Sequence, residues 1–281
     1  MATIKRYRYI IDNDAINEIN KIDDNYILKV YKGNSSNQAE LIYDNYDNFE
    51  IEEVSTTIDF TKTTFTEAEV ETAIRYNAVS NFKVGDILTI NNKYCSQWVV
   101  IGKDHDGTTG TIDIMSTVLI WSGHYSHNGK YGTTSSYYAG YNAIIKSYYE
   151  FDNMIISSAC KNINFKVASS LTDGTTKTAR AKIISCVEMN FTTFDRDMPG
   201  YGSYKEGEPY TYFARDQHNN SVPQRWIRSG RGVSTSYYWT RSRCDDTYIW
   251  VISSTGYSDN KKYDTDCGIA PILRLGSMIN E

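Results

Sequence analysis

The 281-residue sequence lacks the signatures of several large classes of protein. No apolar run approaches the roughly 18 residues that a membrane-spanning helix needs. The first residues lack the basic, apolar and small-residue order of a secretory signal. The net charge of −5 provides no general attraction to phosphate backbones. We therefore expect a protein made in a cytoplasm, with neither a membrane nor nucleic acid among its partners.

Motifs of catalysis and cofactor binding are also missing. There is no glycine-rich phosphate loop with its lysine, no Gly-x-Ser-x-Gly turn and no Cys-x-x-Cys pair. The cysteines are odd in number and widely spaced, which favours buried free thiols: Cys95, Cys160, Cys186, Cys244 and Cys267. We therefore expect no cofactor and no catalysis, although acidic residues for acid–base chemistry are plentiful.

Two short motifs are candidates for metal binding. Asp104 and Asp106 on a glycine loop, with Asp113, could offer oxygen ligands to Ca²⁺, but the ligand set of an EF-hand is incomplete. His124 and His127 lie between glycines, which favour a loop over the helix that would let the two share a metal. We expect a polar turn and surface contacts respectively, and no metal, with Ca²⁺ at Asp104 and Asp106 left open.

Tyrosine is the informative excess, with 24 residues against 9 Phe and 5 Trp. Tyrosine provides rigid amphipathic contact area, so it is typical of binding surfaces. A codon bias toward Asn, Tyr, Lys and Ile would give the same excess. Composition therefore predicts a β-rich globular protein with a surface suited to recognition, and leaves these two explanations open.

Residues 1–60 differ from the rest and are expected to form a small β-rich module. A strand is expected at 5–11, and strands at 25–31 and 39–43 flank a loop typical of a hairpin. So few strands cannot bury a core by themselves. The segment is either a docking module or an extension that packs on its own domain; we expect the former.

Residues 61–281 are expected to form the main domain. Thr66 and Glu69 match a capping box, and Phe65 can pack against Val70, so a helix should run to about Tyr76. The other expected elements are strands at 86–90, 98–102 and 111–115, a helix at 136–150, a shorter helix and turn at 154–170, a buried segment at 181–187, long loops at 195–235, and strands at 237–242, 248–252 and 268–275.

Arginine stands beside large aromatics at 225–228 and at 237–243, a pairing typical of contact surfaces. The alternative is that these residues belong to the core. For Trp239 and Arg241 we favour the core, with Arg241 paired to a buried carbonyl or carboxylate, because Trp is highly buried on average.

The order of several short motifs carries a family resemblance over about residues 66–276. The motifs are Trp98-Val99-Val100-Ile101-Gly102-x-Asp104-His105-Asp106, Tyr148-Tyr149, Ile183-Ile184-Ser185-x-x-Glu188, Trp239-x-Arg241-Ser242 and Gly268-Ile269-Ala270-Pro271-Ile272-Leu273. This order resembles a domain of unknown function that recurs in prophages and tailed phages of Gram-positive bacteria. Its ending is similar to the C-type-lectin-like domains of phage adhesins and of the formylglycine-generating-enzyme type.

The resemblance implies an α+β fold for 61–281: a C-type-lectin-like domain with two helices, a twisted antiparallel sheet and long loops. It implies structural roles for Trp98, Trp239, Arg241, Gly268 and Pro271. It places the ligand contacts in the stretch before the last strand: Tyr237, Tyr238, Asp245, Asp246, Tyr248, Tyr257, Asp259, Asn260, Lys261 and Tyr263.

Two features of those families are absent. The Glu-Pro-Asn or Gln-Pro-Asp tripeptide of calcium-dependent lectins is missing, and Val222-Pro223-Gln224 does not replace it. The closely spaced cysteine pair of the formylglycine-generating enzymes is missing too, since Cys244 and Cys267 lie far apart. Neither calcium-dependent sugar binding nor oxidase chemistry is therefore carried over.

We therefore expect a tailed-phage virion protein, at the tail tip, baseplate or a fibre, that binds a host-surface receptor, most simply a glycan, without catalysis. Residues 1–60 would attach it to other virion proteins, and a homo-oligomer is expected, a trimer being one option. One alternative is a purely structural part, such as a head decoration or baseplate component, that contacts only phage proteins. Another is a polysaccharide or cell-wall hydrolase, which needs two converging carboxylates.

Overall fold

The computed structural model describes residues 2–11, 15–20, 30–33, 39–43, 50–92, 95–125, 151, 153–168, 174–191, 206–213, 223–225, 227–229, 237–245 and 247–277. The chain divides into two compact units, residues 1–61 and 62–281. The division lies one residue beyond the boundary expected from the sequence. The expected helix at 136–150 lies outside the described residues.

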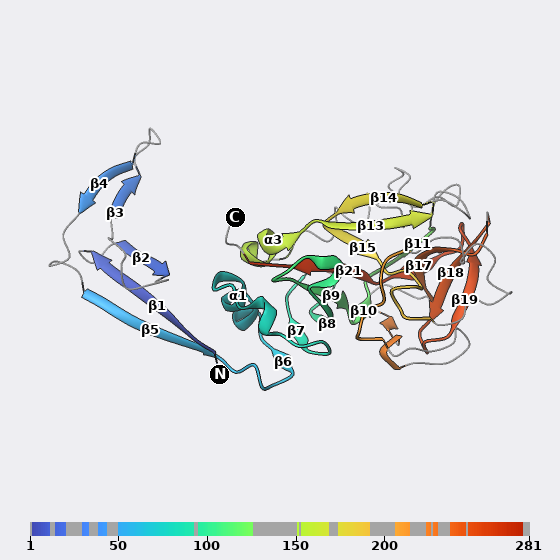
Figure 1. Ribbon diagram of the computed structural model, residues 1–281, viewed down its shortest axis with the longest axis horizontal. Helices are drawn as coiled ribbons and strands as arrows, with labels where there is room; N and C mark the ends of the chain where they lie inside the picture. Colours follow the sequence, from blue (N-terminus) through green and yellow to red (C-terminus); the bar gives the residue numbers. More distant parts are fainter. Residues whose placement is uncertain are drawn as a thin grey trace. The chain divides into compact units, whose positions relative to one another are not determined.

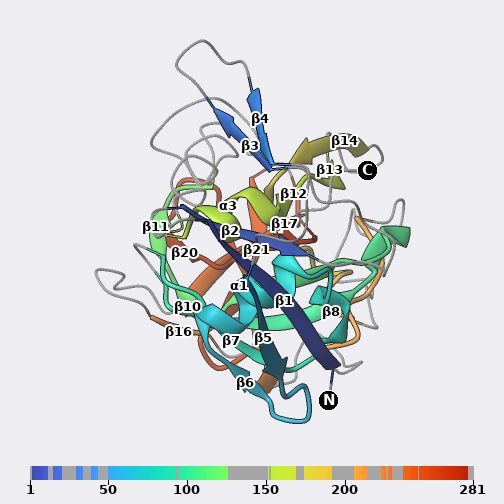
Figure 2. The same cartoon turned by 90° about the vertical axis from the view of Figure 1, so that its left-hand side faces the viewer.

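The first unit is built of antiparallel strands (Figures 1 and 2). A three-stranded sheet has the order β2-β1-β5, and a separate hairpin joins β3 to β4. Their bounds are β1 (Ala2–Ile11), β2 (Ala15–Asn20), β3 (Val30–Gly33), β4 (Ala39–Tyr43) and β5 (Glu50–Ile58). The hairpin expected around residues 33–39 is therefore confirmed, as is the strand at 5–11.

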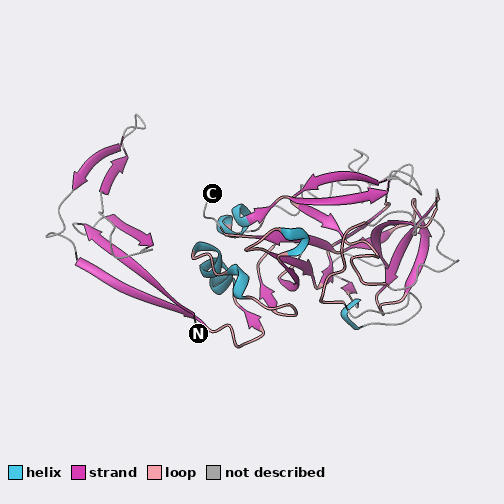
Figure 3. Cartoon of the chain, in the orientation of Figure 1, coloured by secondary structure: helices cyan, strands magenta, loops and turns pink. Residues whose placement is uncertain are grey.

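The second unit contains two larger sheets with short helices (Figure 3). Its helices are α1 (Glu67–Arg75), α3 (Met154–Ala159) and the 3₁₀ helices η2 (Val79–Asn81), η3 (His105–Gly107) and η4 (Pro223–Arg225). Its strands are β6 (Thr64–Phe65), β7 (Ile87–Thr89), β8 (Gln97–Lys103), β9 (Ile112–Ser116), β10 (Val118–Leu119), β11 (Trp121–Gly123), β12 (Cys160–Lys161), β13 (Ile163–Ala168), β14 (Gly174–Ala179), β15 (Ala181–Ile183), β16 (Arg228–Ser229), β17 (Tyr237–Arg243), β18 (Tyr248–Ser253), β19 (Ser258–Lys262), β20 (Cys267–Ile269) and β21 (Pro271–Leu275).

One sheet has the order β12-β21-β9-β8-β7-β6, with β15 also paired to β21. The other has the order β11-β20-β17-β18-β19. The chain passes from the second sheet to the first at Ala270, between β20 and β21. The two last strands of the sequence therefore connect both sheets, and β13–β14 forms an additional hairpin.

The expected α+β, C-type-lectin-like fold is wrong. The described part of the chain is mostly β-sheet, with α1 and α3 as its two α-helices, so the protein is β-rich. The α+β class came from the resemblance, whereas the apolar runs that form β8 and β18 were expected as strands, and their consecutive residues are buried in the sheets. Two helices of nine and six residues contribute little beside them.

Helix α1 begins as its sequence predicts. The Thr66 side chain accepts from the Glu69 backbone N–H, and the Glu69 carboxylate accepts from the Thr66 backbone N–H, which completes a capping box. The helix buries Val70, Ala73 and Ile74. This start is confirmed because it depends only on contacts between neighbours in sequence.

The core contains Trp98, Trp239 and all five cysteines, which are free and buried as expected. Burial raises the pKa of the Cys160 thiol to about 12, so it stays protonated and unreactive at neutral pH. Trp239 donates from Nε1 to the carbonyl of Gly123 at 2.8 Å. Among the described helices, none is long and apolar enough to cross a membrane.

Gly268 on β20 is expected to tolerate no side chain. A Cβ there would lie 2.5 Å from Cδ1 of Leu119, which is fully buried and has little room to move. We expect Gly268→Ala to lower the free energy of unfolding by about 1–3 kcal/mol, measured by urea denaturation. Adding Leu119→Val removes the clashing atom, so the double variant should lose less stability than the two single losses added together. Additive losses would contradict this account.

Candidate functional site

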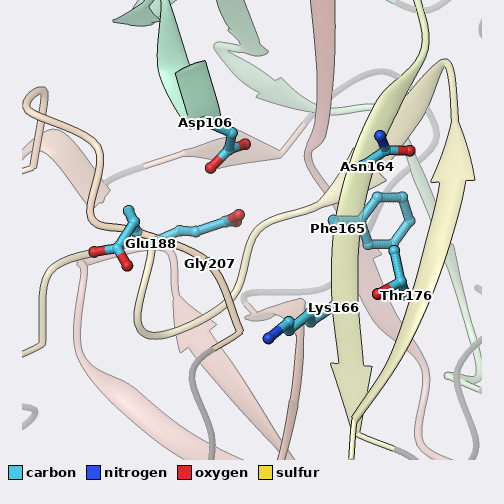
Figure 4. Close-up of a pocket in the computed structure, with 8 residues that line it drawn as sticks. Asp106, Asn164, Phe165, Lys166, Thr176, Glu188 and Gly207 are labelled. Carbon is cyan, nitrogen blue, oxygen red and sulfur yellow. The ribbon is translucent and has the colours of Figure 1, made fainter. Parts of the chain in front are cut away.

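The described residues of the second unit surround a cavity of about 310 Å³ (Figure 4). It is lined by Asp106 of η3, by Asn164, Phe165 and Lys166 of β13, by Thr176 of β14, and by Glu188, Gly207 and Glu208. Figure 4 shows Asp106 and Glu188 on one side and the β13–β14 residues on the other. The site therefore combines three segments that are far apart in sequence.

The hairpin β13–β14 presents polar groups to the cavity. Lys166 pairs with Thr176 across the hairpin, so these residues share one face, and both are exposed. Phe165, between Asn164 and Lys166 in β13, is buried and also lines the cavity. Arg241 contacts β13 of this hairpin at two points. Its Nε donates to the Lys166 carbonyl at 2.9 Å, and its guanidinium lies 5.5 Å from the Phe165 ring centroid.

Beneath the cavity lies a buried ion cluster of Lys182, Glu188 and Arg241. Arg241 donates to both carboxylate oxygens of Glu188, at 2.6 and 2.7 Å, and Lys182 donates to Oε1 at 2.7 Å. The side chains of all three are at most 1% exposed. The Ser185 backbone N–H donates to Oε2 as well, at 3.1 Å. The Glu188 carboxylate therefore has hydrogen-bond donors on both oxygens.

This cluster determines the protonation of Glu188. Burial by itself would raise the pKa of that carboxyl, but the charges of Arg241 and Lys182, together with their hydrogen bonds, lower it to about 2. Glu188 is thus a permanent anion at neutral pH. The sequence favoured a core position for Arg241, paired with a buried carbonyl or carboxylate, over a contact surface. In the structure Arg241 is buried and bonds to both kinds of partner, the Glu188 carboxylate and the carbonyls of Ile183 and Lys166.

A second buried cluster surrounds Arg274. Arg274 donates to both carboxylate oxygens of Asp113, at 2.6 and 2.8 Å, and its Nη2 lies 3.4 Å from Oδ2 of Asp106. The Tyr210 hydroxyl donates to Asp113 at 2.7 Å. Burial and the carboxylates of Asp113 and Glu188 raise the pKa of Tyr210 well above its usual value, so this hydroxyl stays protonated.

Tyr210 connects the two clusters. Lys182 Nζ lies 5.1 Å from the centroid of its ring, and His105 stacks on it with centroids 3.9 Å apart. Burial lowers the pKa of His105, whose Nε2 lies 3.3 Å from Asp106 Oδ1. The wall of the cavity at Asp106 is therefore held by packed aromatic rings as well as by ion pairs.

Gly207 fits closely against the Glu188 cluster. Its φ of +118° is a conformation that side chains rarely adopt, and a Cβ would lie 2.7 Å from Glu188 Oε1. The backbone can therefore approach the carboxylate only because residue 207 is glycine. The neighbouring Glu206 accepts from the Ser242 hydroxyl through its carboxylate and from Arg241 through its carbonyl.

The predicted metal candidates have other partners in the structure. Asp104 Oδ1 accepts from the Thr111 N–H at 3.2 Å, while Asp106 and Asp113 lie against Arg274. The segment is a tight turn in which Asp104 and Asp106 both have positive φ, as the polar-turn alternative expects. Within the described residues, no group of three or more Cys, His, Asp or Glu is arranged to hold a metal ion.

His124 Nε2 lies 3.5 Å from Asp266 Oδ1, and both side chains are exposed. His127 lies outside the described residues.

The residues expected to bind ligand do not form a site together. Tyr238 is fully buried, with its hydroxyl donating to the Arg225 carbonyl at 2.9 Å, so its assignment to a contact surface is wrong. Its neighbour Tyr237 points the opposite way, because side chains alternate along β17. Asp245 accepts from the N–H groups of Thr247 and Tyr248 and stabilises a turn.

The rest of that set lies on or near the hairpin β18–β19. Tyr248 and Tyr257 are exposed, and Lys261 Nζ lies 2.6 Å from Asp259 Oδ2 and 4.5 Å from the Tyr237 ring centroid. Asn260 is the central residue of β19, which is a strand where loop was expected. Tyr263 follows β19, with its N–H on the Thr247 carbonyl, and Asp246 lies outside the described residues.

None of the nine described residues of this set lines the cavity. In the sequence, Glu188 stands within one of the short motifs and Asp106 is a metal candidate, but nothing there indicates that the two lie close together. The hairpin β13–β14 was not predicted either. Its one local signal in the sequence is the alternation of apolar Ile163, Phe165 and Val167, which are buried in the structure. Phe165 and its polar neighbours Asn164 and Lys166 line the cavity.

Comparison of the chain with family models, with curated proteins and with solved structures found no match.

Proposed function

We propose that this protein is a virion component of a tailed phage, at the tail tip, the baseplate or a fibre, that binds a host-surface carbohydrate without catalysis. Residues 62–281 hold the binding site and residues 1–61 attach to other virion proteins. The observation that carries the binding role is the cavity of about 310 Å³, in whose mainly apolar lining Asp106, Lys166 and Glu208 are charged. The order of the motifs that resemble phage domains supports the phage part, independently of the fold class expected at first.

The chemistry of the cavity suits a hydroxylated ligand. The carboxylates of Asp106 and Glu208 accept hydrogen bonds, Lys166 donates them, and the amide of Asn164 does both. Phe165 adds apolar surface. Sugar hydroxyls both donate and accept, and the volume is at the lower end of ligand pockets, so one residue or one end of a glycan is the matching size.

Glu188 is unsuited to acid catalysis of hydrolysis. A glycosidase needs one carboxyl that gives up a proton near neutral pH. Glu188, with a pKa of about 2 and both oxygens bonded to Arg241, cannot serve as that acid. It instead fixes Arg241, and through it the hairpin that forms the wall of the cavity.

Filling the cavity should weaken carbohydrate binding. Thr176→Trp places an indole at the lining, whereas Thr175→Trp places it on the opposite face of the same exposed strand. We expect the first variant to bind wall polysaccharide purified from Gram-positive bacteria at least about tenfold more weakly than the wild type, and the second to bind like the wild type. The measurement is calorimetry or immobilised-polysaccharide binding on full-length protein.

Three results would contradict the proposal. Equal binding by both tryptophan variants would place the site elsewhere. Absence of binding by folded wild-type protein to every wall polysaccharide tested would favour a purely structural virion role. Shortening of the polymer by the wild type, lost in Asp106→Asn or Glu208→Gln, would identify a hydrolase.

A further inference from the structure

A second pocket of the second unit, the small pocket, has a volume of about 70 Å³. It is lined by residues of β7, β8 and β9, by Thr117, and by Tyr212, Gln224 and Ile227, and it shares no lining residue with the larger cavity. One water molecule needs about 10–15 Å³ by the same measure, so the small pocket has room for about five atoms or groups of that size. That is the size of one substituent of a larger molecule.

The small pocket is accessible from solvent. Its lining includes Val99, Met115 and Ile227, which are 6%, 2% and 4% exposed, and these buried residues form its floor. Tyr212 is half-buried and Gln224 is exposed, and these residues form its rim. A substituent can therefore enter while the molecule that carries it stays at the surface.

The floor presents a row of apolar side chains. Ile87 of β7 pairs with Val99 of β8, and Val99 pairs with Met115 of β9. Residues directly opposite each other on neighbouring strands point to the same face of a sheet, so the three side chains lie side by side. Such a row suits a methyl group.

Polar groups stand beside this row. The Thr117 hydroxyl donates its proton to the Gln97 carbonyl at 3.0 Å, so its lone pairs remain to accept. Burial raises the pKa of Tyr212, so its hydroxyl keeps its proton and can donate. Within the described part of the chain, no hydrogen bond occupies that hydroxyl. The small pocket therefore offers one donor and one acceptor next to apolar surface.

The chemistry of the lining excludes several kinds of substituent. None of the described residues that line the small pocket is charged. A carboxylate, a phosphate or an ammonium group would lose its hydration there without gaining a counter-charge. An alkyl group would leave the hydroxyls of Thr117 and Tyr212 unpaired. A neutral group with a methyl, an acceptor and a donor is needed, and an acetamido group has all three.

We propose that the small pocket binds the acetamido group of an N-acetylated amino sugar. The methyl group packs on Ile87, Val99 and Met115. The carbonyl accepts from the Tyr212 hydroxyl, and the amide N–H donates to the Thr117 hydroxyl, while the sugar ring stays at the rim. Acetylated lysine carries the same group at the end of a long apolar stem, for which a volume of about 70 Å³ leaves no room.

The site does not depend on the proposed function, because the small pocket and the cavity have no lining residue in common. If both sites bind, one chain contacts a host polysaccharide at two places, and the apparent affinity exceeds that of either site alone.

Saturation-transfer NMR on full-length protein tests the ligand. The probes are the methyl glycosides of N-acetylglucosamine and N-acetylgalactosamine, compared with those of glucose and galactose. We expect about millimolar binding of at least one acetylated sugar, with more saturation on its acetamido methyl than on any ring proton. The sugars without the acetamido group should bind at least about tenfold more weakly.

Three results with these probes would overturn the proposal. The first is no saturation of either acetylated sugar, and the second is a methyl group no more saturated than the ring. The third is a peptide with N-acetyl-lysine that binds as tightly as the sugar.

Variants locate the binding in the protein. Ile87→Trp fills the small pocket and should weaken binding of the acetylated sugar at least about tenfold, whereas Ile87→Val keeps the pocket open and should bind like the wild type. Tyr212→Phe removes the donor at nearly constant volume and should weaken binding about three- to tenfold. Circular dichroism checks that each variant is folded, and Tyr212→Phe decides the matter if Ile87→Trp does not fold.

The two sites are separated with Thr176→Trp, which fills the cavity only. Saturation of the acetamido methyl should persist in this variant, even if the cavity binds no carbohydrate at all. Loss of the methyl signal in Thr176→Trp, or equal binding by Ile87→Trp and Ile87→Val, would place the acetamido group outside the small pocket and overturn the proposal. Unchanged binding by Tyr212→Phe would do the same.

Discussion

Replacing Arg241 with alanine is expected to lower the free energy of unfolding by about 3–5 kcal/mol, because it leaves Glu188 buried without its main counter-charge. Arg241 supplies two of the hydrogen bonds to that carboxylate and also bonds the carbonyls of Ile183 and Lys166. These acceptors would remain in the interior without their donor. Urea denaturation followed by tryptophan fluorescence measures the loss.

A matched control is Arg75→Ala on α1. Arg75 pairs with Glu71 one helical turn away at 2.7 Å, but its side chain is 38% exposed. Such a pair contributes under about 1 kcal/mol. Equal losses for Arg75→Ala and Arg241→Ala would show that burial does not determine the contribution of Arg241.

The cluster as a whole need not be stabilising. Replacing all three members with apolar residues, as Lys182→Met, Glu188→Leu and Arg241→Met, removes the buried charges together. Such replacements are often neutral in other proteins, whereas removal of one partner is costly. We therefore expect the triple variant to be more stable than Arg241→Ala. Binding of carbohydrate should nevertheless fall, because Arg241 no longer positions the hairpin at the cavity.

Stability should fall by about 3 kcal/mol as the pH is lowered from about 4.5 to about 2, from the titration of Glu188 alone. The folded-state pKa of about 2 lies below the ordinary value of 4.5. The unfolded chain therefore binds a proton more readily than the folded chain in this interval. Protonation then favours unfolding, so the stabilisation is present above pH 4.5 and is lost as the pH falls through 2.

The variant Glu188→Gln separates this contribution from the other carboxylates. Glutamine leaves Lys182 and Arg241 without their anion, so the variant should be less stable than the wild type at pH 7. It has no proton to bind at this position, so its stability should fall less steeply between pH 4.5 and 2. Urea denaturation over this range gives both slopes, and parallel curves for variant and wild type would contradict the assignment.

Local features of the fold could be predicted because their causes are local. The start of α1 depends on Thr66 and Glu69, three residues apart, and the β3–β4 hairpin depends on the loop between its strands. The burial of the cysteine thiols follows from their apolar character and from the absence of a pairing motif. The α+β class was wrong because it was taken from a resemblance of short motifs, whereas the apolar runs at 98–102 and 248–252 had been expected as strands and are strands.

The residues expected to bind ligand could not be judged from local sequence, because their exposure depends on tertiary packing. Tyr237 and Tyr238 are neighbours of the same type, yet Tyr238 is fully buried and Tyr237 is not. Every residue of β17 after Tyr237 is buried, on both faces of the strand, and Tyr237 is its first residue. Whether each position is covered depends on what packs against it. A run of tyrosines and aspartates therefore resembles a binding surface until its sheet is known.

By itself, the sequence determined the helix cap, the hairpin turns, the apolar strands and the free thiols, since each follows from residues close together in the chain. Only the tertiary structure decided that Asp113 meets Arg274, 161 residues away, and that Glu188 meets Arg241, 53 residues away. Those contacts form because a buried charge must find an opposite charge wherever the strand order places one. The cavity over them depends on that strand order, which no local pattern encodes.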